Sequence, residues 1–549
     1  MEIKISNKVL KIIAPIILIS FSLIGLFIYK DYGISWDEYI QRTIGIKYIR
    51  YIVEFLNLDI FFNTINFDKV IPFHEWRLSG EVQIYYGVFF ELPLIILEFL
   101  FLGSEGNEWQ IYHLRHIATF LMYMVGVWGF HSQVVKTFKS LIPGIVAVIF
   151  LLLSPRIFAE AFYNSKDIIF MSFVSLGMLT LTNLTIKPNI KNILLHSLIV
   201  AFAIDIRVMG IFFIPLTFFV IFFNFIIKKL NLIKTIKITI IYLVSNYLFI
   251  IIFFPLLWES PLENFLGVFQ NMSAFPADTT MLYMGSTVFE NNLPWHYIPV
   301  WILVTTPPLI ILLFFSGIIF LVLKIYKNKI SNYEEKEIIL IANLLLVVCS
   351  IFVVIFLQST LYNGWRHMYF VYPSMIIISV EAFFRIFDKF KDFRFKTLIF
   401  TFVFITFIFH QVNLIVKSHP MQNVYFNFIV GKNWKNKFDL DYWGLGNHLV
   451  IRDILLRDTN EKITVCEKSY MALKTTLRIL DQSEKNRIKL QCSYNNSHVQ
   501  KVNNEPDYLI DNYFRPFEIK NINLNKYKIF NELKVFDEII ITVYKKKSS

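Results

Sequence analysis

The sequence predicts an all-α polytopic membrane protein of about 11 transmembrane helices, with a small α/β domain at its C-terminal end. Its 549 residues are 56% hydrophobic and only 17% charged, and the mean hydropathy is +0.54. Soluble globular chains are typically about 45–50% apolar and about 25% charged. The composition therefore excludes an ordinary soluble enzyme, and the 58 Phe and 27 Tyr exclude a disordered chain.

Stretches that can cross the hydrocarbon core, about 20 apolar residues each, recur along the first three quarters of the chain. Eleven of them begin near Leu10, Leu114, Leu141, Asp167, Ile193, Met209, Ile238, Ile298, Ile338, Arg366 and Thr397. Because the number is odd, the two termini are expected on opposite sides of the membrane. Alternate links carry pairs of basic residues: Lys136 with Lys139, Lys187 with Lys191, Lys228 with Lys229, Lys324 with Lys327, and Arg385 with Lys389. This bias predicts a cytoplasmic N-terminus and an extracytoplasmic C-terminus.

The first outer loop, residues 31–113, is long enough to hold structure of its own. Ser35 and Glu38 have the spacing of a helix capping box, which predicts an amphipathic helix from there to about Leu56. Further on, the apolar stretch from Phe89 to Leu102 is too short for a span. We expect this stretch to form a helix that lies in the membrane interface.

We expect residues 1–415 to form a multi-span membrane domain and residues 416–549 an extracytoplasmic α/β domain. Its strand-like runs are Ile463–Cys466, Ile488–Cys492, Tyr508–Ile510 and Glu538–Tyr544, and an amphipathic helix is expected at Tyr470–Leu480. Cys466 and Cys492 each end a candidate strand, which fits a disulfide and two unpaired core cysteines about equally well. Near the start of this domain, Tyr442-Trp443-Gly444 fits either stacking on a sugar or packing in a turn.

Asp37 is the first candidate for chemistry. It follows the first span in Gly33-Ile34-Ser35-Trp36-Asp37-Glu38, where the capping box uses Glu38 and leaves Asp37 without a partner. A carboxylate at the outer membrane surface is suited to deprotonating an acceptor hydroxyl. The structural alternative is that Asp37 only stabilises the positive end of the helix.

A dense polar set lies between the third and fourth spans, within Ser154–Asp167. It comprises Arg156, Glu160, Asn164, Lys166 and Asp167. Ser165 could cap the fourth span with Asp167 in its first turn, which is a structural explanation. Charges at such a depth are costly and rare, so we expect at least one of them to serve function.

Five basic or imidazole side chains at the outer boundary run against the positive-inside trend. They are Arg115, His116, Arg207, Arg366 and His367. Arg207 could snorkel or pair with Asp205, but a guanidinium is also well suited to a ligand phosphate.

The absence of a nucleotide-binding motif bears on mechanism. No His or Cys cluster has metal-ligand spacing, and the sequence has no Gly-rich phosphate loop. The outer compartment supplies neither ATP nor nucleotide sugars, so a reaction at this face must take its activated group from a lipid. A polyprenyl-phosphate sugar fits, because its tail can lie among the spans while the arginines stabilise the departing phosphate.

The chain resembles the protein O-mannosyltransferase and aminoarabinose transferase group of membrane glycosyltransferases, which have the GT-C fold (glycosyltransferase family 39-like). The resemblance lies in the acidic pair Asp37-Glu38 after an N-terminal span, and in the segments Tyr112–His116, Phe162–Asp167, Asp205–Gly210 and Asn363–Phe370. Asn164-Ser165-Lys166-Asp167 is similar to the Asn-Pro-Lys-Asp stretch of bacterial members, with Ser165 in place of the proline. The order of the segments also agrees, over roughly residues 1–415.

The resemblance implies inverting transfer of a hexosyl or pentosyl group from a polyprenyl-phosphate donor to an acceptor hydroxyl on the periplasmic face. The catalytic residues implied are Asp37 as the acceptor-activating base, Asp167 as second acid and Glu38 as a further candidate. We assign donor-phosphate binding to Arg207, Arg366, Arg115 and Lys166, and substrate binding to His367, Trp36 and Tyr86. Relatives often carry a Lys-Pro-Pro-Leu-like segment in the first outer loop, where this chain reads Tyr85 to Leu92, so no lysine is expected to reach the phosphate from there.

The expected partners are a lipid-linked sugar donor, an acceptor that is a protein, lipid or glycan, and membrane lipid, with no nucleic acid. No cofactor is implied, and divalent-metal dependence stays open. The abundance of Lys, Asn and Ile indicates an AT-rich bacterial genome and hence a bacterial inner membrane. The main alternative is a transporter or flippase of lipid-linked glycans, which more often shows internal repeats and helices broken at the midplane. A polymer ligase would use the same donor on a different fold.

Overall fold

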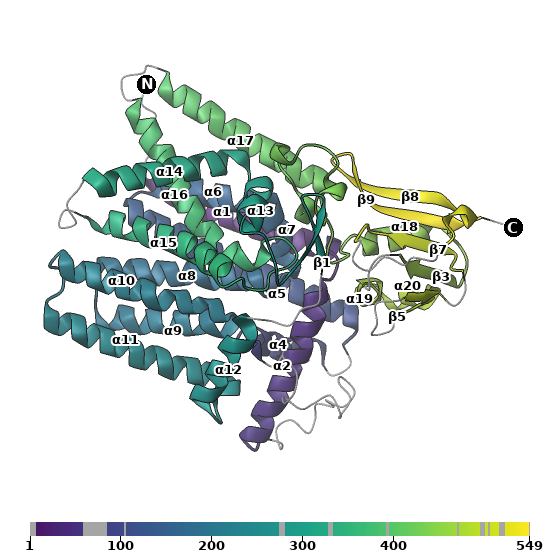
Figure 1. The fold of residues 1–549 in the computed structure, drawn as a ribbon, viewed down its shortest axis with the longest axis horizontal. Helices are drawn as coiled ribbons and strands as arrows, with labels where there is room; N and C mark the ends of the chain where they lie inside the picture. Colours follow the sequence, from purple (N-terminus) through teal and green to yellow (C-terminus); the bar gives the residue numbers. More distant parts are fainter. Residues whose placement is uncertain are drawn as a thin grey trace.

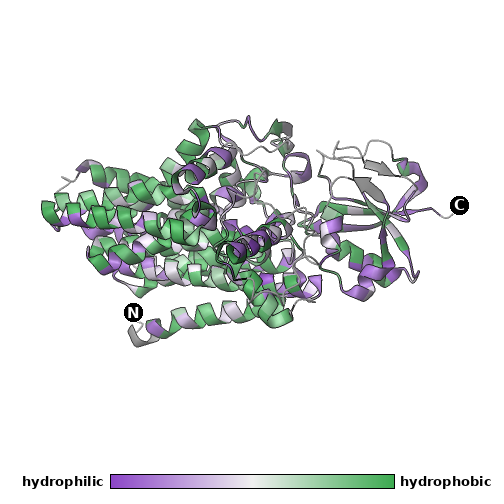
Figure 2. Cartoon of the chain, turned by 90° about the horizontal axis from the view of Figure 1, so that it is seen from below, coloured by the Kyte–Doolittle hydropathy of each residue, from purple (hydrophilic) through white to green (hydrophobic). Residues whose placement is uncertain are grey.

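The computed structural model describes residues 7–58, 85–103, 106–273, 280–327, 333–390, 395–468, 472–494, 500–502, 505–514 and 522–547. Long helices that run in roughly the same direction form one end of the molecule, and most strands gather at the other end (Figure 1). The helical part is mostly hydrophobic, whereas hydrophilic residues are more frequent around the strands (Figure 2). This division agrees with the predicted order of a membrane part followed by a small α/β part.

Eight segments of the described chain are long and apolar enough to cross a membrane. They are α1 (Asn7–Ile28), α8 (Asp167–Ile186), η5 (Val208–Phe212) with α10 (Phe213–Ile226), α11 (Leu232–Phe253), α14 (Pro308–Lys327), α15 (Glu335–Phe356), η8 (Arg366–Val371) with α16 (Tyr372–Lys389), and α17 (Lys396–Ser418). Their positions confirm eight of the eleven predicted spans. The polytopic helical architecture is therefore the one that the sequence predicted.

The other three predicted spans form helices that differ from simple crossings. α5 (Glu108–Phe138) and α9 (Ile190–Ile206) lie where the second and fifth spans were expected, and both pack against α8. Polar side chains such as His116 and Gln133 lower the average hydropathy of α5, and α9 has only 17 residues. The count of clear spans is therefore lower than the predicted eleven.

The predicted third span is a bent pair of helices, α6 (Leu141–Leu152) and α7 (Pro155–Tyr163), which meet at 71°. Pro155 is the first residue of α7, a position where its missing N–H is tolerated while the preceding helix cannot continue through it. Every residue of α7 is buried. The bend therefore carries the polar set of residues 154–167 into the interior of the protein.

The first outer loop holds the two helices that the sequence predicted there. α2 (Trp36–Phe55) begins with a capping box, in which the Glu38 carboxylate accepts from the Ser35 N–H at 2.8 Å and the Ser35 hydroxyl accepts from the Glu38 N–H at 3.3 Å. α4 (Glu91–Leu102) occupies the predicted interfacial stretch and packs against α2.

The segment between the predicted seventh and eighth spans contains elements that were not predicted. α12 (Pro261–Ser273) is followed by a hairpin of β1 (Thr280–Tyr283) and β2 (Ser286–Phe289). The predicted eighth span, expected to begin near Ile298, is divided into α13 (Tyr297–Thr305) and α14. The two turn residues of the hairpin, Met284 and Gly285, both have positive φ, at 52° and 86°. Such a turn matches the twist of antiparallel strands, although Met is an unusual residue for it.

The C-terminal region, residues 419–547, contains a five-stranded mixed sheet of order β4-β3-β7-β9-β8. Its elements are α18 (Asn447–Arg457), β3 (Ile463–Glu467), α19 (Ala472–Thr476), α20 (Gln482–Arg487), β4 (Ile488–Leu490), β7 (Tyr508–Asp511), β8 (Tyr527–Val535) and β9 (Glu538–Lys546). β3 is parallel to β4 and β7, and the pairs that involve β9 are antiparallel. A separate pair is formed by β5 (Cys492–Tyr494) and β6 (Gln500–Val502).

The four predicted strands of this region are confirmed, although the second is divided between β4 and β5. The predicted helix Tyr470–Leu480 is shorter, because α19 covers only Ala472–Thr476; Tyr470 itself lies outside the described residues. α18 and β8 were not predicted. Cys466 is disulfide-bonded, as one of the two interpretations held, and Cys349 is free.

Candidate functional site

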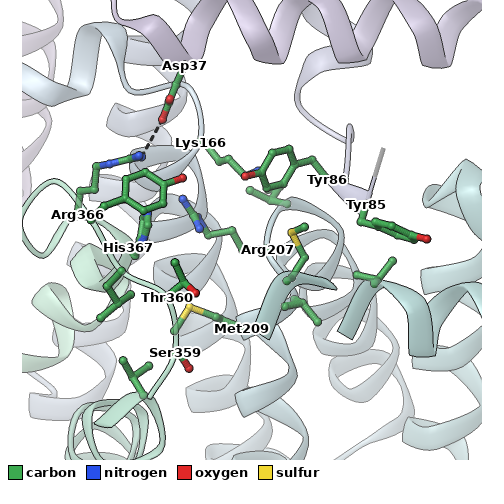
Figure 3. Close-up of a pocket in the computed structure, with 18 of the residues that line it drawn as sticks. Asp37, Tyr85, Tyr86, Lys166, Arg207, Met209, Ser359, Thr360, Arg366 and His367 are labelled. Carbon is green, nitrogen blue, oxygen red and sulfur yellow. Dashed lines mark hydrogen bonds and ion pairs between the residues drawn. The ribbon is translucent and has the colours of Figure 1, made fainter. Parts of the chain in front are cut away.

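A cavity of about 760 Å³ lies among the first turn of α2, the loop before α4, the start of η5, the end of α15 and the start of η8. Seven predicted site residues line it: Trp36, Asp37, Tyr86, Lys166, Arg207, Arg366 and His367. Figure 3 shows six of these side chains converging from separate elements: Asp37, Tyr86, Lys166, Arg207, Arg366 and His367. Residues that are far apart in the sequence thus line one cavity, whereas the other three predicted site residues, Glu38, Arg115 and Asp167, do not line it.

One part of the cavity wall is apolar. It is formed by Ile204, Ile206, Val208, Met209, Ile211, Phe212, Val268, Phe269, Met272, Val353, Val354 and Leu357. These residues come from α9, η5, α12 and the end of α15, and most were not singled out from the sequence. Val268, Phe269 and Met272 lie between two predicted spans, and the other residues belonged to predicted spans. An apolar residue that faces a cavity cannot be distinguished by sequence from one that faces lipid.

The neighbours Asp37 and Glu38 point to different surroundings. Asp37 accepts a hydrogen bond from Arg366 Nη1 at 2.8 Å, and its side chain is 24% exposed. Glu38 is fully buried, where it closes the helix cap and lies 3.1 Å from His116 Nε2. Glu38 does not line the cavity, so the structure gives this predicted catalytic residue a place in the helix cap instead.

Asp167 lies between two arginines behind the cavity wall. Arg366 Nη1 donates to Asp167 Oδ2 at 2.8 Å, and Arg207 Nη2 donates to Asp167 Oδ1. The Asp167 side chain is 1% exposed. Asp167 therefore holds the two guanidinium groups beside each other, and its burial separates it from the more accessible Asp37.

The cap at the start of α8 differs from the expected one. The Asn164 side chain accepts from the Asp167 N–H at 2.8 Å, whereas Ser165, which was expected to do so, has a buried hydroxyl with no hydrogen-bond partner among the described residues. In a typical Asx cap, a side-chain oxygen accepts a hydrogen bond from the backbone N–H three residues later in the chain. Asn164 therefore fixes the backbone of Asp167.

Lys166 lies next to Asp167, with its ammonium group over the ring of Tyr86 (Figure 3). The amine has no hydrogen-bond partner among the described residues. Burial lowers the pKa of Lys166 well below its usual value, and the charge of Arg207 lowers it further. A bound anion would compensate both effects.

Arg207 does not pair with Asp205, contrary to one interpretation of the sequence. Asp205 instead accepts the backbone N–H of Phe89 at 2.8 Å. Gly87 lies so close that a Cβ there would be 1.6 Å from the Asp205 carbonyl oxygen. Asp205 therefore fixes the first outer loop beside the cavity, and Arg207 is left to pair with Asp167.

Aromatic rings cover Arg366 from two sides. Its guanidinium lies 5.0 Å from the ring centre of Tyr362 and 5.0 Å from that of Trp443. The Tyr362 ring also meets His367 edge-on at 4.8 Å. Tyr362 was not predicted, although it lies four residues before Arg366, and Trp443 comes from the C-terminal region.

Arg115 was predicted to bind the donor phosphate, and the structure places it elsewhere. It is completely buried against Glu91 and Glu98 of α4, with Glu98 at 2.8 Å, and Arg42 of α2 also pairs with Glu98 at 2.8 Å. It does not line the cavity. Two carboxylates already compensate the two arginines, so this cluster joins α2, α4 and α5.

The described residues contain no group of three or more His, Cys, Asp or Glu side chains arranged to hold a metal ion. Asp37 and Asp167 instead share Arg366.

Comparisons with known proteins give no family assignment, because no family model and no curated protein matches the chain. Among solved structures, ArnT from Cupriavidus metallidurans bound to undecaprenyl phosphate is 10% identical with a TM-score of 0.43, and the match covers 97% of this chain and 98% of that chain. The apo state of ArnT is 9% identical with a TM-score of 0.45, covering 96% and 97%. Both TM-scores are below 0.5, so the function proposed below rests on the residues of the site.

Proposed function

We propose that the protein is a GT-C-type integral membrane glycosyltransferase that moves a sugar from a polyprenyl-phosphate donor to an acceptor hydroxyl at the outer face of a bacterial inner membrane. The observation that carries the proposal is the composition of the cavity, in which three cationic side chains and a partly exposed carboxylate adjoin an apolar wall. A polyprenyl-phosphate sugar has the matching order of an isoprenoid tail, a phosphate and a sugar.

The phosphate would bind at Lys166, Arg207 and Arg366. Lys166 has no carboxylate partner among the described residues, and Nε of Arg207 and both Nε and Nη2 of Arg366 lack hydrogen-bond partners there. Guanidinium groups form strong charge-assisted hydrogen bonds with phosphate. The same cations would stabilise the charge that builds up on the phosphate as it leaves.

Asp37 would act as the general base. Its side chain is 24% exposed against 1% for Asp167, so an acceptor can reach Asp37 more readily. The acceptor oxygen would bond to C1 of the sugar as the bond from C1 to the phosphate oxygen breaks. The hydroxyl proton would pass to Asp37, and the electron pair of the broken bond would stay on the phosphate. One displacement of this kind inverts the configuration at C1.

The resemblance to the protein O-mannosyltransferase and aminoarabinose transferase group agrees with this proposal at four of five segments. Asp37, Lys166, Arg207 and Arg366, from four different segments, line the same cavity. The fifth segment contributes Arg115, which lies in a separate cluster. A transporter of lipid-linked glycans would also need an anion site beside an apolar wall, but it would not need a base next to the phosphate.

The test is sugar transfer from a panel of radiolabelled polyprenyl-phosphate hexoses and pentoses, using purified full-length protein and crude envelope acceptors. We expect Asp37→Asn to lower turnover by about 10²- to 10⁴-fold, the usual contribution of a general base, while polyprenyl phosphate still binds. Asp31→Asn is the matched control, because Asp31 is half-exposed and pairs with His419 outside the cavity.

Two outcomes would contradict the proposal. Full turnover in Asp37→Asn would remove the base from this position. Binding of every donor without any cleavage by the wild-type protein would instead favour the transporter.

A further inference from the structure

We infer that the C-terminal region positions the donor-phosphate site, through a turn at residues 441–446 whose Tyr442 and Trp443 reach into the membrane part. This inference rests on the proposed function and concerns the assembly of the same site. It assigns a role to a region that could otherwise serve only to select the acceptor.

Trp443 forms part of the cavity wall and covers Arg366. Its side chain is buried, and the Arg366 guanidinium lies 5.0 Å from the ring centre. On its other side the ring meets Tyr163 of α7 edge-on at 5.7 Å. An aromatic face restricts a guanidinium to one plane while leaving its N–H groups free. Trp443 thereby directs Arg366 towards Asp37, Asp167 and the cavity.

Tyr442 reaches a buried acid, Glu160, that links two elements of the site. The Tyr442 hydroxyl donates to Glu160 Oε1 at 3.2 Å, and the Tyr369 hydroxyl donates to the same oxygen at 2.7 Å. Tyr369 belongs to η8, the short helix that begins with Arg366. One carboxylate oxygen thus joins the C-terminal region to the helix that carries the phosphate-binding arginine.

The second carboxylate oxygen of Glu160 is connected to Asp167 through the side chain of Asn164. Glu160 Oε2 accepts from Asn164 Nδ2 at 2.8 Å, and the same amide lies 3.2 Å from Asp167 Oδ2. Asn164 also accepts the Asp167 N–H. The chain from Tyr442 to Glu160 to Asn164 therefore ends at Asp167, which holds Arg207 and Arg366.

The turn itself is fixed within the C-terminal region. The Asp441 carboxylate accepts the N–H groups of Leu445 at 3.0 Å and Gly446 at 2.7 Å. Gly444 has a φ of +65°, and a Cβ there would lie 2.4 Å from Ala472. Tyr442 and Trp443 are thus presented by a rigid turn, which suits a positioning role.

The experiment measures binding of a long-chain polyprenyl phosphate to the purified full-length protein in detergent. Tyr442→Phe removes one hydroxyl, and its matched control is Tyr508→Phe, because the Tyr508 hydroxyl also binds a carboxylate, Asp458 at 2.7 Å, away from the cavity. We expect Tyr442→Phe to weaken binding by about fivefold, in keeping with one hydrogen bond, and the control to leave it unchanged.

Trp443 is tested by its dependence on Arg366. Trp443→Ala should weaken binding by about tenfold, and Trp443→Phe, which retains a ring, should restore most of the loss. In an Arg366→Lys background, Trp443→Ala should have little further effect, because the group that it orients is gone. If Trp443→Ala weakens binding only because it disturbs the fold, the same decrease in affinity would also occur in the Arg366→Lys background.

Different results would contradict the proposed function and the positioning role of the C-terminal region. A wild-type protein that does not bind polyprenyl phosphate overturns the proposed function. A wild-type protein that binds, with Tyr442→Phe and Trp443→Ala equal to it, overturns this inference alone. Variants that raise only the acceptor KM would also overturn it and would make the C-terminal region an acceptor-selecting element.

Discussion

Two clusters of charged residues at the predicted outer side of the protein differ in their charge balance and in their relation to the cavity. One joins Arg115 and Arg42 to Glu91 and Glu98 among α2, α4 and α5. The other comprises Asp37, Lys166, Asp167, Arg207 and Arg366 around the cavity.

The first cluster, with two arginines and two carboxylates, is balanced and does not line the cavity. In the second, Arg207 and Arg366 pair with Asp37 and Asp167, and Lys166 is a third cation that has no carboxylate partner among the described residues. The nearby Asp205 accepts a backbone N–H instead. The difference suggests a rule that can be tested: an arginine at a membrane boundary binds a ligand where carboxylates do not already compensate its charge. Four predictions test this comparison.

The largest effect is expected in the balanced cluster. Arg115→Met leaves Glu91 and Glu98 in a buried site with Arg42 as their remaining cation. Removal of one partner of a buried ion pair typically costs about 3–5 kcal/mol, so we expect a large loss of thermal stability in detergent. Adding Glu91→Gln should recover part of it. An unchanged melting temperature would show that the cluster contributes nothing to folding.

Next, Arg207→Met should act on binding more than on folding. Arg207 keeps a side chain that is 15% exposed, and Asp167 retains Arg366. Loss of a charge-assisted hydrogen bond of about 1.5–3 kcal/mol corresponds to a decrease of about 10- to 100-fold in affinity for polyprenyl phosphate. If affinity stays at the wild-type value while stability falls, Arg207 belongs with Arg115 as a structural residue.

The third prediction concerns pH. Burial lowers the pKa of Lys166, and a bound phosphate favours the protonated amine. Binding therefore takes up a proton once the pH exceeds the lowered pKa, and the affinity should fall as the pH rises. Lys166→Met should weaken binding by about tenfold and abolish this dependence.

Measurements above about pH 7 keep the charge of the phosphate nearly constant, since its second pKa is about 6. The affinity of wild-type protein and of Lys166→Met is compared across that range. A slope that persists in Lys166→Met would assign the pH dependence to another group.

The smallest effect is expected for Glu38→Gln, beside the proposed base. The amide oxygen can still accept the Ser35 N–H, so the cap is weakened rather than lost. We expect a loss of about 1 kcal/mol in stability and turnover per folded molecule close to the wild-type value. A loss of turnover as large as that of Asp37→Asn would restore Glu38 as a catalytic candidate.

Most helices and strands could be predicted from the sequence, whereas the contacts between them could not. The apolar runs, the capping box at Ser35 and four strands could be located because each is a local pattern. The pairing of Asp37 with Arg366 could not be predicted, because the two residues are 329 positions apart. No local pattern specifies which distant side chain will face another.

The position of Arg115 outside the cavity could not be predicted, for a physical reason. Arg115 lies at the start of a span, as Arg366 does. Glu91 and Glu98 belong to the predicted interfacial helix, and no sequence pattern indicates that these two side chains face Arg115. Trp443 illustrates the opposite case. Its motif was noted, but its contact with Arg366 depends on how the C-terminal region packs on the membrane helices.

The separation of the site residues along the chain has a consequence for biosynthesis. Asp167 and Arg207 are 40 residues apart and can meet soon after their helices are inserted. Arg366 is synthesised much later, and Trp443 later still. A nascent chain that stops between Arg207 and Arg366 contains Asp37 without its ion-pair partner and lacks part of the cavity wall. On the proposed assignment, the donor site is therefore complete only after translation has passed Trp443, so that donor binding at full strength depends on synthesis of the C-terminal region.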